Sequence, residues 1–333
     1  MFGSTLKWNS AINTLVNQSS KAMVNLYKLD IMCGSMPPAT AFSLFDKLVV
    51  PVLCYGAEVW GYDIQERIER VHTKFCKRVL GVSYSTSNAA VLGDCGRYPL
   101  FVVYYVKCIK FWLKIIHMEN RRLTKECYQL SKQLDENGRN TWSTKVKILL
   151  SKYGFADVWL YQGVANVGVF LNMFKQRIRD CYLQDWQNSI INSGKLALYR
   201  NIKSSISQAP YLGIFREKKH RSIMAKFRCS NHQLAIETGR HNPNHIDQDD
   251  RICIYCLRHY NVRIVEDEYH FLIKCPLYDD IRKRYIVHIL SKYNINNERV
   301  TAILLGSKDN SVINSVGLYI YHSFNARKTY VEP

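Results

Sequence analysis

Residues 99–121 read PLFVVYYVKCIKFWLKIIHMENR, and this stretch gives the clearest indication of the fold class. Proline at position 99 suits the first turn of a helix, because its φ is fixed and it has no amide hydrogen to leave unpaired. The stretch is apolar on almost every side of a helix, which predicts a buried helix. At 100° per residue its polar side chains fall within about 80° of one another, so we expect one narrow basic edge. That edge consists of Lys107, Lys110, Lys114, His117 and Arg121.

A second helix is predicted over residues 64–80. Its apolar residues recur at the spacing of a single helical stripe, namely Ile64, Ile68, Val71, Phe75 and Val79. Its basic residues fall on the opposite side, within about 100° of one another. They are Arg67, Arg70, Lys74, Lys77 and Arg78. Each basic edge is either a solvated helix face with extended lysines or a surface that follows a phosphate backbone.

The rest of the chain also reads as helices separated by glycine and proline. Further amphipathic helices are predicted over 141–153 and 167–191, and no stretch alternates with the period of a strand. Trp142, Trp159 and Trp186 lie in apolar patterns and are predicted to be core residues. The predicted fold class is all-α: an elongated multi-helix array with a small C-terminal zinc-stabilised module.

Composition favours a polyanionic partner. The 333 residues include 46 Lys and Arg against 27 Asp and Glu, a formal charge of +19, with 47% hydrophobic residues. A folded chain this basic is expected to meet nucleic acid more often than a membrane surface, although charge that only keeps the protein soluble is the alternative. The densest positive segment contains Arg216, Lys218, Lys219, Arg221, Lys226 and Arg228.

The expected compartment is the nucleus or the cytoplasm. No apolar run reaches the roughly 18 residues of a membrane span, and the first residues do not have the pattern of a secretory signal. The 11 cysteines are an odd number and mostly lie singly in helical patterns, which is typical of reduced thiols. We therefore expect a protein that is neither secreted nor held in a membrane.

The sharpest chemical motif is Cys253-x2-Cys256-x13-His270-x4-Cys275. Three thiolates and one imidazole are a common ligand set for structural Zn²⁺, and a Cys-x2-Cys turn supplies two ligands at once. His270 and Cys275 would lie about 140° apart on an unbroken helix. Pro276 disfavours the helical conformation at the preceding residue, so the helix that carries His270 should end at Cys275.

Two alternatives to this ligand set remain open. His259 follows Cys256 at the same spacing and would replace His270. A separate site would combine Cys229 and His232 with His241 and His245, although Pro243 prevents the last two from sharing a helix face.

Catalytic motifs are largely missing from the sequence. There is no glycine-rich phosphate loop and no Gly-x-Ser-x-Gly. Residues 277–280 read LYDD, which is superficially like a polymerase metal motif, but the surroundings read as helix. Asp279 and Asp280 are better explained as acidic residues in the first turn of a helix. No catalytic residue is assigned, and enzymatic activity is not expected.

Three stretches give the chain a resemblance to the C-terminal part of non-LTR (LINE-like) retrotransposon reverse transcriptases. Residues 44–60, LFDKLVVPVLCYGAEVW, resemble the thumb helix of that family. Residues 233–240, QLAIETGR, resemble a segment before its zinc module, and residues 250–278 resemble the Cys-Cys-His-Cys module itself.

The resemblance implies contact with RNA or DNA through the thumb and the zinc module. Only about 40 residues precede Leu44, and they read as helix, so the resemblance implies a remnant that lacks the polymerase palm. The predicted segments are a thumb-like helical region (1–92), a helical connector (93–215), and a region with a basic helix, the zinc module and C-terminal helices (216–333). The alternative function is a helical interaction or structural protein with incidental positive charge, and no small-molecule substrate is expected.

Overall fold

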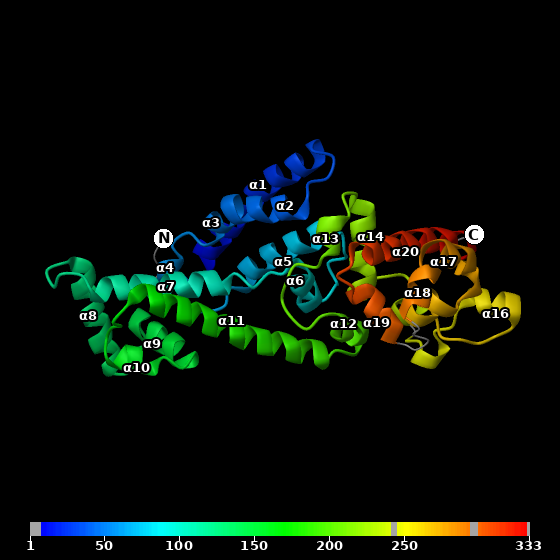
Figure 1. Cartoon of the computed structure of the whole chain (residues 1–333). Helices are drawn as coiled ribbons and strands as arrows, with labels where there is room; N and C mark the ends of the chain where they lie inside the picture. The colour runs from blue at the N-terminus through cyan, green and yellow to red at the C-terminus, as the bar shows by residue number, and fades with distance from the viewer. Residues whose placement is uncertain (1–7, 241–244, 294–298, 332–333) are drawn as a thin grey trace. The chain divides into compact units, whose positions relative to one another are not determined.

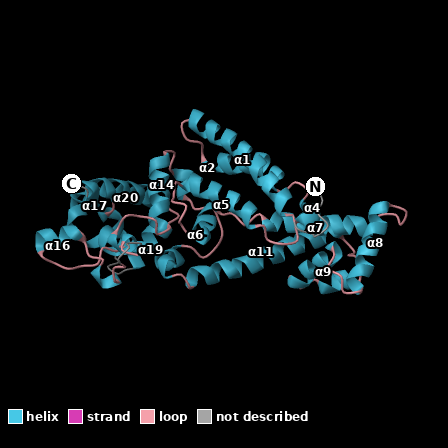
Figure 2. Cartoon of the chain, turned by 180° about the vertical axis from the view of Figure 1, so that it is seen from behind, coloured by secondary structure: helices cyan, strands magenta, loops and turns pink. Residues whose placement is uncertain are grey.

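The computed structural model describes residues 8–240, 245–293 and 299–331, in which loops connect a series of helices (Figures 1 and 2). Within these ranges there is no β-strand, and the one extended pairing is an isolated antiparallel bridge between Ile252 and Val265. The predicted all-α class is therefore confirmed.

The chain divides into two compact units. The first comprises Met1–Cys33, Thr40–Thr73 and Tyr98–Asp185, and the second comprises Gly34–Ala39, Lys74–Arg97 and Trp186–Pro333. The segments predicted from sequence, 1–92, 93–215 and 216–333, stay a prediction.

The helices up to residue 191 are α1 (Asn9–Met32), α2 (Pro38–Leu44), the π-helical η1 (Phe45–Val49), α3 (Val50–Leu53), α4 (Ala57–Trp60), α5 (Glu66–Leu80), α6 (Asn88–Cys95), α7 (Phe101–Ile116), α8 (Leu123–Glu136), α9 (Trp142–Lys152), α10 (Ala156–Leu160) and α11 (Val167–Ile191).

The helices after residue 191 are the 3₁₀-helical η2 (Gly194–Leu196), α12 (Ala197–Ile202), α13 (Tyr211–Ile214), α14 (Lys218–Arg228), α15 (Ala235–Thr238), η3 (Gln248–Asp250), α16 (Ile254–Tyr260), the π-helical η4 (His270–Lys274), η5 (Pro276–Tyr278), α17 (Asp279–Tyr285), α18 (Val287–Tyr293), α19 (Arg299–Gly306) and α20 (Asn310–Val331).

Helix α7 is the centre of the first unit. Its side chains Tyr104, Tyr105 and Trp112 are fully buried, and the ring of Trp112 stacks on that of Trp159 at 5.7 Å between centroids. Helices α4, α8 and α9 pack against it. The two oxygens of Glu69 accept the backbone amides of Leu100 and Phe101 at 2.9 and 2.7 Å, so a side chain from α5 satisfies the start of α7.

The ends of the predicted helices are less accurate than their existence. The predicted helix over 99–121 ends at Ile116, because His117 leaves the helical conformation and its Nδ1 lies 2.6 Å from the carbonyl oxygen of Leu113. Arg121 therefore lies outside α7. Ile64 precedes α5 and is exposed, so it does not belong to the apolar stripe. The predicted helix over 167–191 coincides with α11.

Two of the three tryptophans predicted to be in the core are buried there. Trp159 and Trp186 are buried, and the indole of Trp186 donates to the carbonyl of Ala89 at 2.8 Å. Trp142 is half-buried and meets the ring of Phe111 edge-on.

The second unit is organised around α14 and α20, which pack against each other. Helices α13 and α17 also pack on α20. Gly317 of α20 lies so close to Phe215 that a Cβ atom built there would be 2.2 Å from the ring. A fully buried polar group centred on Asp94 joins α6 to α14 in the same unit.

Candidate metal centre

The four predicted ligands converge in the second unit. The thiols of Cys253, Cys256 and Cys275 and the imidazole of His270 are buried, and their ligand atoms all lie within 4.8 Å of one another. The Sγ atom of Cys275 is 3.9 Å from each of the other two sulfurs, and Nε2 of His270 is 3.4 Å from Sγ of Cys256. A tetrahedron with Zn–S bonds of ~2.3 Å has S···S edges of about 3.8 Å. The cluster thus has the dimensions of a four-coordinate metal site.

The first pair of ligands is held by a short extended pairing and a helix start. The bridge between Ile252 and Val265 brings two chain segments together, and the amide of Cys253 donates to the carbonyl of Ile264 at 2.8 Å. Cys253 then adopts an extended conformation at the N-terminus of α16, so Cys256 follows within its first turn. The backbone amide of Cys256 donates to the sulfur of Cys253, which favours the thiolate.

The second pair of ligands depends on a π-helical turn. The amide of Cys275 donates to the carbonyl of His270 at 2.8 Å, a hydrogen bond between residues five apart. In η4, therefore, His270 and Cys275 lie roughly one turn apart and on the same side. Cys275 itself is extended, with φ −64° and ψ 122°, and Pro276 begins the next helical turn. The predicted break at Cys275 is confirmed, and the π-turn adds a geometry that the sequence did not indicate.

The thiols of the cluster differ in how readily they ionise. A hydrogen bond from Cys275 is the main cause that lowers the pKa of Cys253, to about 4. Burial raises the pKa of Cys256 to about 11, and the hydrogen bond to Cys253 raises the pKa of Cys275. A single thiolate forms readily in the cluster, and further thiolates need a cation to offset their charge.

Four basic residues, Arg251, Arg258, Lys274 and Arg282, lie close to the four ligands along the chain. Two of them, Arg251 and Arg282, are buried and bind backbone carbonyls. Nε of Arg282 donates to Leu272 and its NH2 group to Cys275, both at 2.9 Å, so this guanidinium holds the second ligand segment. Arg258 and Lys274 are exposed.

A buried ion pair that no sequence motif indicates links the segment before His270 to α20. Arg327 donates from Nε and NH2 to both carboxylate oxygens of Glu266, at 2.8 and 2.7 Å, and both residues are buried. The hydroxyl of Tyr319 donates to the carbonyl of Phe271 at 2.7 Å, beside His270. Their partners are 48 and 61 residues away along the chain, so no local motif marks them.

The alternative ligands lie apart from the cluster. His259 is exposed, and its ring packs against Tyr255 at 4.5 Å and Tyr330 at 6.0 Å. Cys229 is buried, while Nε2 of His232 lies 3.2 Å from a carboxylate oxygen of Glu268. Of the other two members of that alternative site, His241 lies outside the described residues, as does Pro243, and His245 is exposed.

The basic residues predicted to contact nucleic acid fall into two groups. Those that stay exposed are Arg67, Arg70, Lys74, Lys110, Lys114, Arg216 and Lys219, and Lys218 is half-buried. Some of these have partners: Arg70 pairs with Glu66 at 3.2 Å, Lys219 pairs with Glu217 at 2.7 Å, and Lys74 lies over the ring of Tyr84. Lys110 and Lys114 of α7 have no hydrogen-bond or ion-pair partner among the described residues, so the outer edge of α7 carries two free ammonium groups.

Three of the residues predicted to contact nucleic acid have side chains that bind groups of the protein itself. Lys77 is buried, and its Nζ donates to the carbonyl of Tyr84 at 2.8 Å. Arg221 is buried and donates to the carbonyl of Phe215 at 3.0 Å and the hydroxyl of Ser35 at 2.9 Å. Lys107 is half-buried and donates to the carbonyl of Cys54 at 3.1 Å. Helical spacing places a residue on a face, but it does not reveal which backbone carbonyls lie opposite.

The two aspartates of the LYDD sequence lie at a helix start. Asp279 and Asp280 occupy the first turn of α17, as predicted, and not a hairpin. Asp279 pairs with Arg282, and Asp280 pairs with Lys283 at 3.5 Å. Each carboxylate thus has a cationic partner one turn further along the helix.

Comparison of the chain with protein-family models, curated proteins and solved structures finds no match. Among the described residues, no helix combines the length and the apolar character that crossing a membrane requires.

Proposed function

We propose that the Cys3His cluster holds one structural Zn²⁺. Three thiolates and one imidazole are soft and borderline donors that suit zinc, and four protein ligands complete a tetrahedron without an open position. Their near-tetrahedral spacing is the observation that carries this proposal. The metal would join two segments, 252–256 and 270–275, of which only the first takes part in the short bridge between Ile252 and Val265. Measurement of the metal content of the purified protein tests this, with one zinc per chain expected.

The proposed function of the whole chain is binding of RNA or DNA through exposed basic helices and the zinc module. The main support is the formal charge of +19 together with the exposed lysines of α7. The resemblance to non-LTR reverse transcriptases points in the same direction, toward nucleic-acid contact and not polymerisation by this chain. A nucleus or cytoplasm, where thiols stay reduced, suits this role.

Salt dependence tests nucleic-acid binding. Each phosphate contact releases condensed counterions, so the logarithm of the association constant falls linearly with that of the salt concentration. Titration of a fluorescent RNA hairpin and the corresponding DNA duplex at salt concentrations from about 50 to about 200 mM should show a steep decline in affinity for at least one of them. A flat response, or no binding at low salt, would contradict the proposal.

The second candidate is a protein–protein interaction role. Its specific support is a set of large apolar side chains that the first unit exposes, including Ile31, Met32, Leu123, Leu160 and Tyr161. Binding of a protein partner by such residues would bury apolar surface and depend weakly on salt, whereas phosphate contacts depend on it strongly. The salt titration therefore separates the two candidates.

A further inference from the structure

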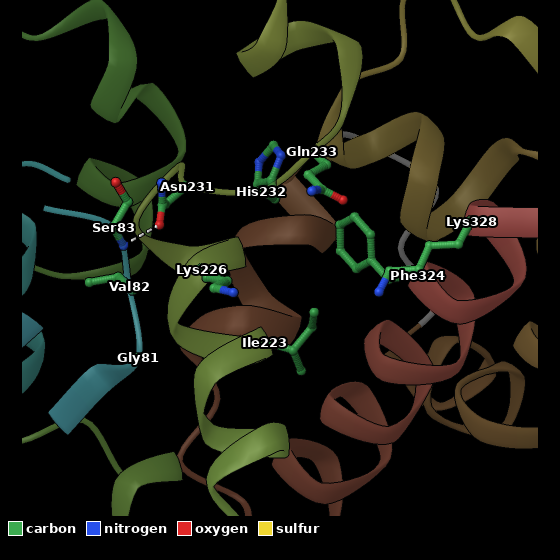
Figure 3. A pocket seen from close by; sticks show the side chains of 10 residues that line it. All are labelled: Gly81, Val82, Ser83, Ile223, Lys226, Asn231, His232, Gln233, Phe324 and Lys328. Carbon is green, nitrogen blue, oxygen red and sulfur yellow. Dashed lines mark hydrogen bonds between the residues drawn. The ribbon is translucent and has the colours of Figure 1, made fainter. Parts of the chain in front are cut away.

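A pocket of about 590 Å³ lies within the second unit (Figure 3). Its wall is formed by α14, the segment that follows α14, the end of α20 and the loop after α5. This volume is in the range of small-ligand sites. None of the metal ligands lines it. Its lining residues are Gly81, Val82, Ser83, Ile223, Lys226, Asn231, His232, Gln233, Phe324 and Lys328.

Two lysines give the pocket its charge. Lys226 belongs to α14 and Lys328 to α20, and Figure 3 shows the side chain of Lys328 extending from α20 into the view toward α14. Lys226 is half-buried and Lys328 is exposed, and neither has an ion-pair partner among the described residues. No Asp or Glu is among the lining residues. Two ammonium groups with no carboxylate among the lining residues favour an anionic ligand.

Polar side chains beside the lysines offer hydrogen bonds. The amide oxygen of Asn231 accepts the backbone amide of Ser83 at 2.8 Å, shown as the dashed line in Figure 3, so the NH2 group of this side chain is left for a ligand. The side chain of Gln233 is exposed at the same pocket. His232 is held at Nε2 by Glu268, and its buried Nδ1 has no hydrogen-bond partner among the described residues.

The pocket also has an apolar wall. Ile223 of α14 and Phe324 of α20 line it, and Phe324 is nearly buried. Some ligands carry both an anionic group and a flat, partly apolar group. The anionic group of such a ligand would contact the lysines, and its flat group would pack against Ile223 and Phe324. The amide side chains of Asn231 and Gln233, which line the same pocket, would meet the hydrogen-bonding edge of such a group.

We propose that this pocket binds one nucleotide, with its phosphate between Lys226 and Lys328 and its base toward Ile223 and Phe324. The shared chemistry is a nucleoside phosphate, which comes either from a nucleic-acid strand or from a free nucleotide. If the nucleotide belongs to a nucleic-acid strand, the proposal rests on the proposed function and makes it more specific. If it is a free nucleotide, the proposal does not depend on that function. Phosphate contacts position such a ligand, and contacts with the base add selectivity.

The test measures binding of AMP, adenosine and a single-stranded hexanucleotide to the full chain by isothermal titration calorimetry. AMP or the hexanucleotide should bind, and adenosine, which lacks the phosphate, should bind far more weakly. In the variant Lys226→Gln/Lys328→Gln, affinity should fall about tenfold for each lysine removed. The matched control is Lys283→Gln/Lys308→Gln, which removes two exposed lysines of the same unit outside the pocket and should leave affinity unchanged.

The outcomes separate the source of the ligand from failure of the proposal. If AMP affinity falls in Lys226→Gln/Lys328→Gln but not in the control variant, the natural ligand is a free nucleotide. If only the affinity for the hexanucleotide falls in the pocket variant, the ligand is a nucleic-acid strand. Equal binding of adenosine and AMP, equal loss in both double variants, or no binding of either phosphate ligand would overturn the pocket assignment. A long RNA that still binds in that last case would leave the proposed function intact. Gln233→Ala provides a second probe, with a smaller loss expected because it removes an exposed amide.

Discussion

The guanidinium of Arg228 forms a bidentate ion pair with the carboxylate of Asp94. It donates from Nε to Oδ2 at 2.9 Å and from NH2 to Oδ1 at 2.8 Å. Both side chains are buried, and the hydroxyls of Tyr199 and Tyr211 donate to the same two oxygens at 3.1 and 3.0 Å. Four hydrogen bonds thus satisfy a carboxylate that has no access to solvent. This arrangement links α6, α12, α13 and α14 in the second unit.

Breaking this pair should destabilise the second unit strongly. Arg228→Met leaves Asp94 charged and unpaired in the interior, which should cost about 3–5 kcal/mol of the free energy of unfolding, measured by urea denaturation. The double variant Asp94→Leu/Arg228→Met should recover part of this loss, because it leaves no isolated charge. As a control, Lys283→Met breaks an exposed pair with Asp280 and should change stability little. Equal stability of Arg228→Met and the control would contradict the assignment.

The same pair predicts a dependence on pH. Burial by itself would raise the pKa of Asp94, but the charge of Arg228 and its hydrogen bonds hold that pKa below the ordinary value. Between the folded and unfolded pKa values the unfolded chain binds more protons, so stability rises with pH in that window. The contribution should be fully present above about pH 4 and lost as pH falls through the folded pKa. The difference in unfolding free energy between the wild type and Asp94→Asn should therefore shrink at low pH.

Removal of a single ligand should abolish metal binding. Cys275→Ser should lower zinc content as strongly as Cys253→Ser, because both sulfurs lie at the corners of the same cluster. His259→Ala is the matched control, since that ring packs on Tyr255 outside the cluster, and its zinc content should equal that of the wild type. Full zinc occupancy in Cys275→Ser would contradict the proposed ligand set. Loss of zinc in His259→Ala would indicate that His259 is a ligand in place of His270.

Chelation should loosen the metal module and spare the first unit. Structural zinc contributes about 10–16 kcal/mol of apparent binding free energy near neutral pH in small modules, which is more than these short segments gain from their own packing. Amide hydrogen exchange should therefore accelerate over residues 252–256 and 270–278 when a chelator is added. Protection in α7 should persist, because its core of Tyr104, Tyr105 and Trp112 does not involve the metal. Faster exchange in α7 to the same degree would count against a local role for the metal.

The free edge of α7 should contribute to the salt dependence of nucleic-acid binding. Lys110→Gln/Lys114→Gln should reduce the slope of log affinity against log salt by roughly 2 if both lysines contact phosphates. The control Lys21→Gln/Lys28→Gln removes two exposed lysines of α1 in the same unit. An equal slope in both double variants would identify the α7 edge as a solvated face.

Gly317 of α20 should not tolerate a side chain. Alanine normally favours a helix interior over glycine by up to about 1 kcal/mol. At position 317 the added Cβ would meet the ring of Phe215, which is buried and cannot swing into solvent, so a net loss of about 1–3 kcal/mol is expected. Gly168→Ala in α11 is the control, since its nearest neighbour would be 3.5 Å away and stability should be kept or raised. Thermal unfolding of the two variants should move in opposite directions.

Local patterns explain which parts could be predicted from the sequence. Helices α5 and α11 could be predicted because their apolar periodicity depends on neighbours within a few residues. The metal cluster could be predicted because known ligand geometry fixes the spacing of Cys253, Cys256, His270 and Cys275. The burial of Lys77 and Arg221 could not be predicted, because each depends on carbonyl oxygens that folding brings into reach. The pairing of Asp94 with Arg228, which are 134 residues apart, is likewise a product of the tertiary fold.

The π-turn of η4 makes the backbone hydrogen-bond pattern, and not only residue identity, decisive for the metal site. A π-turn is equivalent to an α-helical turn with one residue inserted. Deleting one residue from the segment between His270 and Cys275 would allow an ordinary α-helix to close, with the same four ligands still present in the chain. After such a deletion the cysteine would lie four residues after the histidine, about 40° round an α-helix, so its thiol would stay on the same side as the imidazole. Closure as an ordinary α-helix without a deletion would instead place Cys275 about 140° round the helix from His270, whereas substitution of the exposed Lys274 would be tolerated.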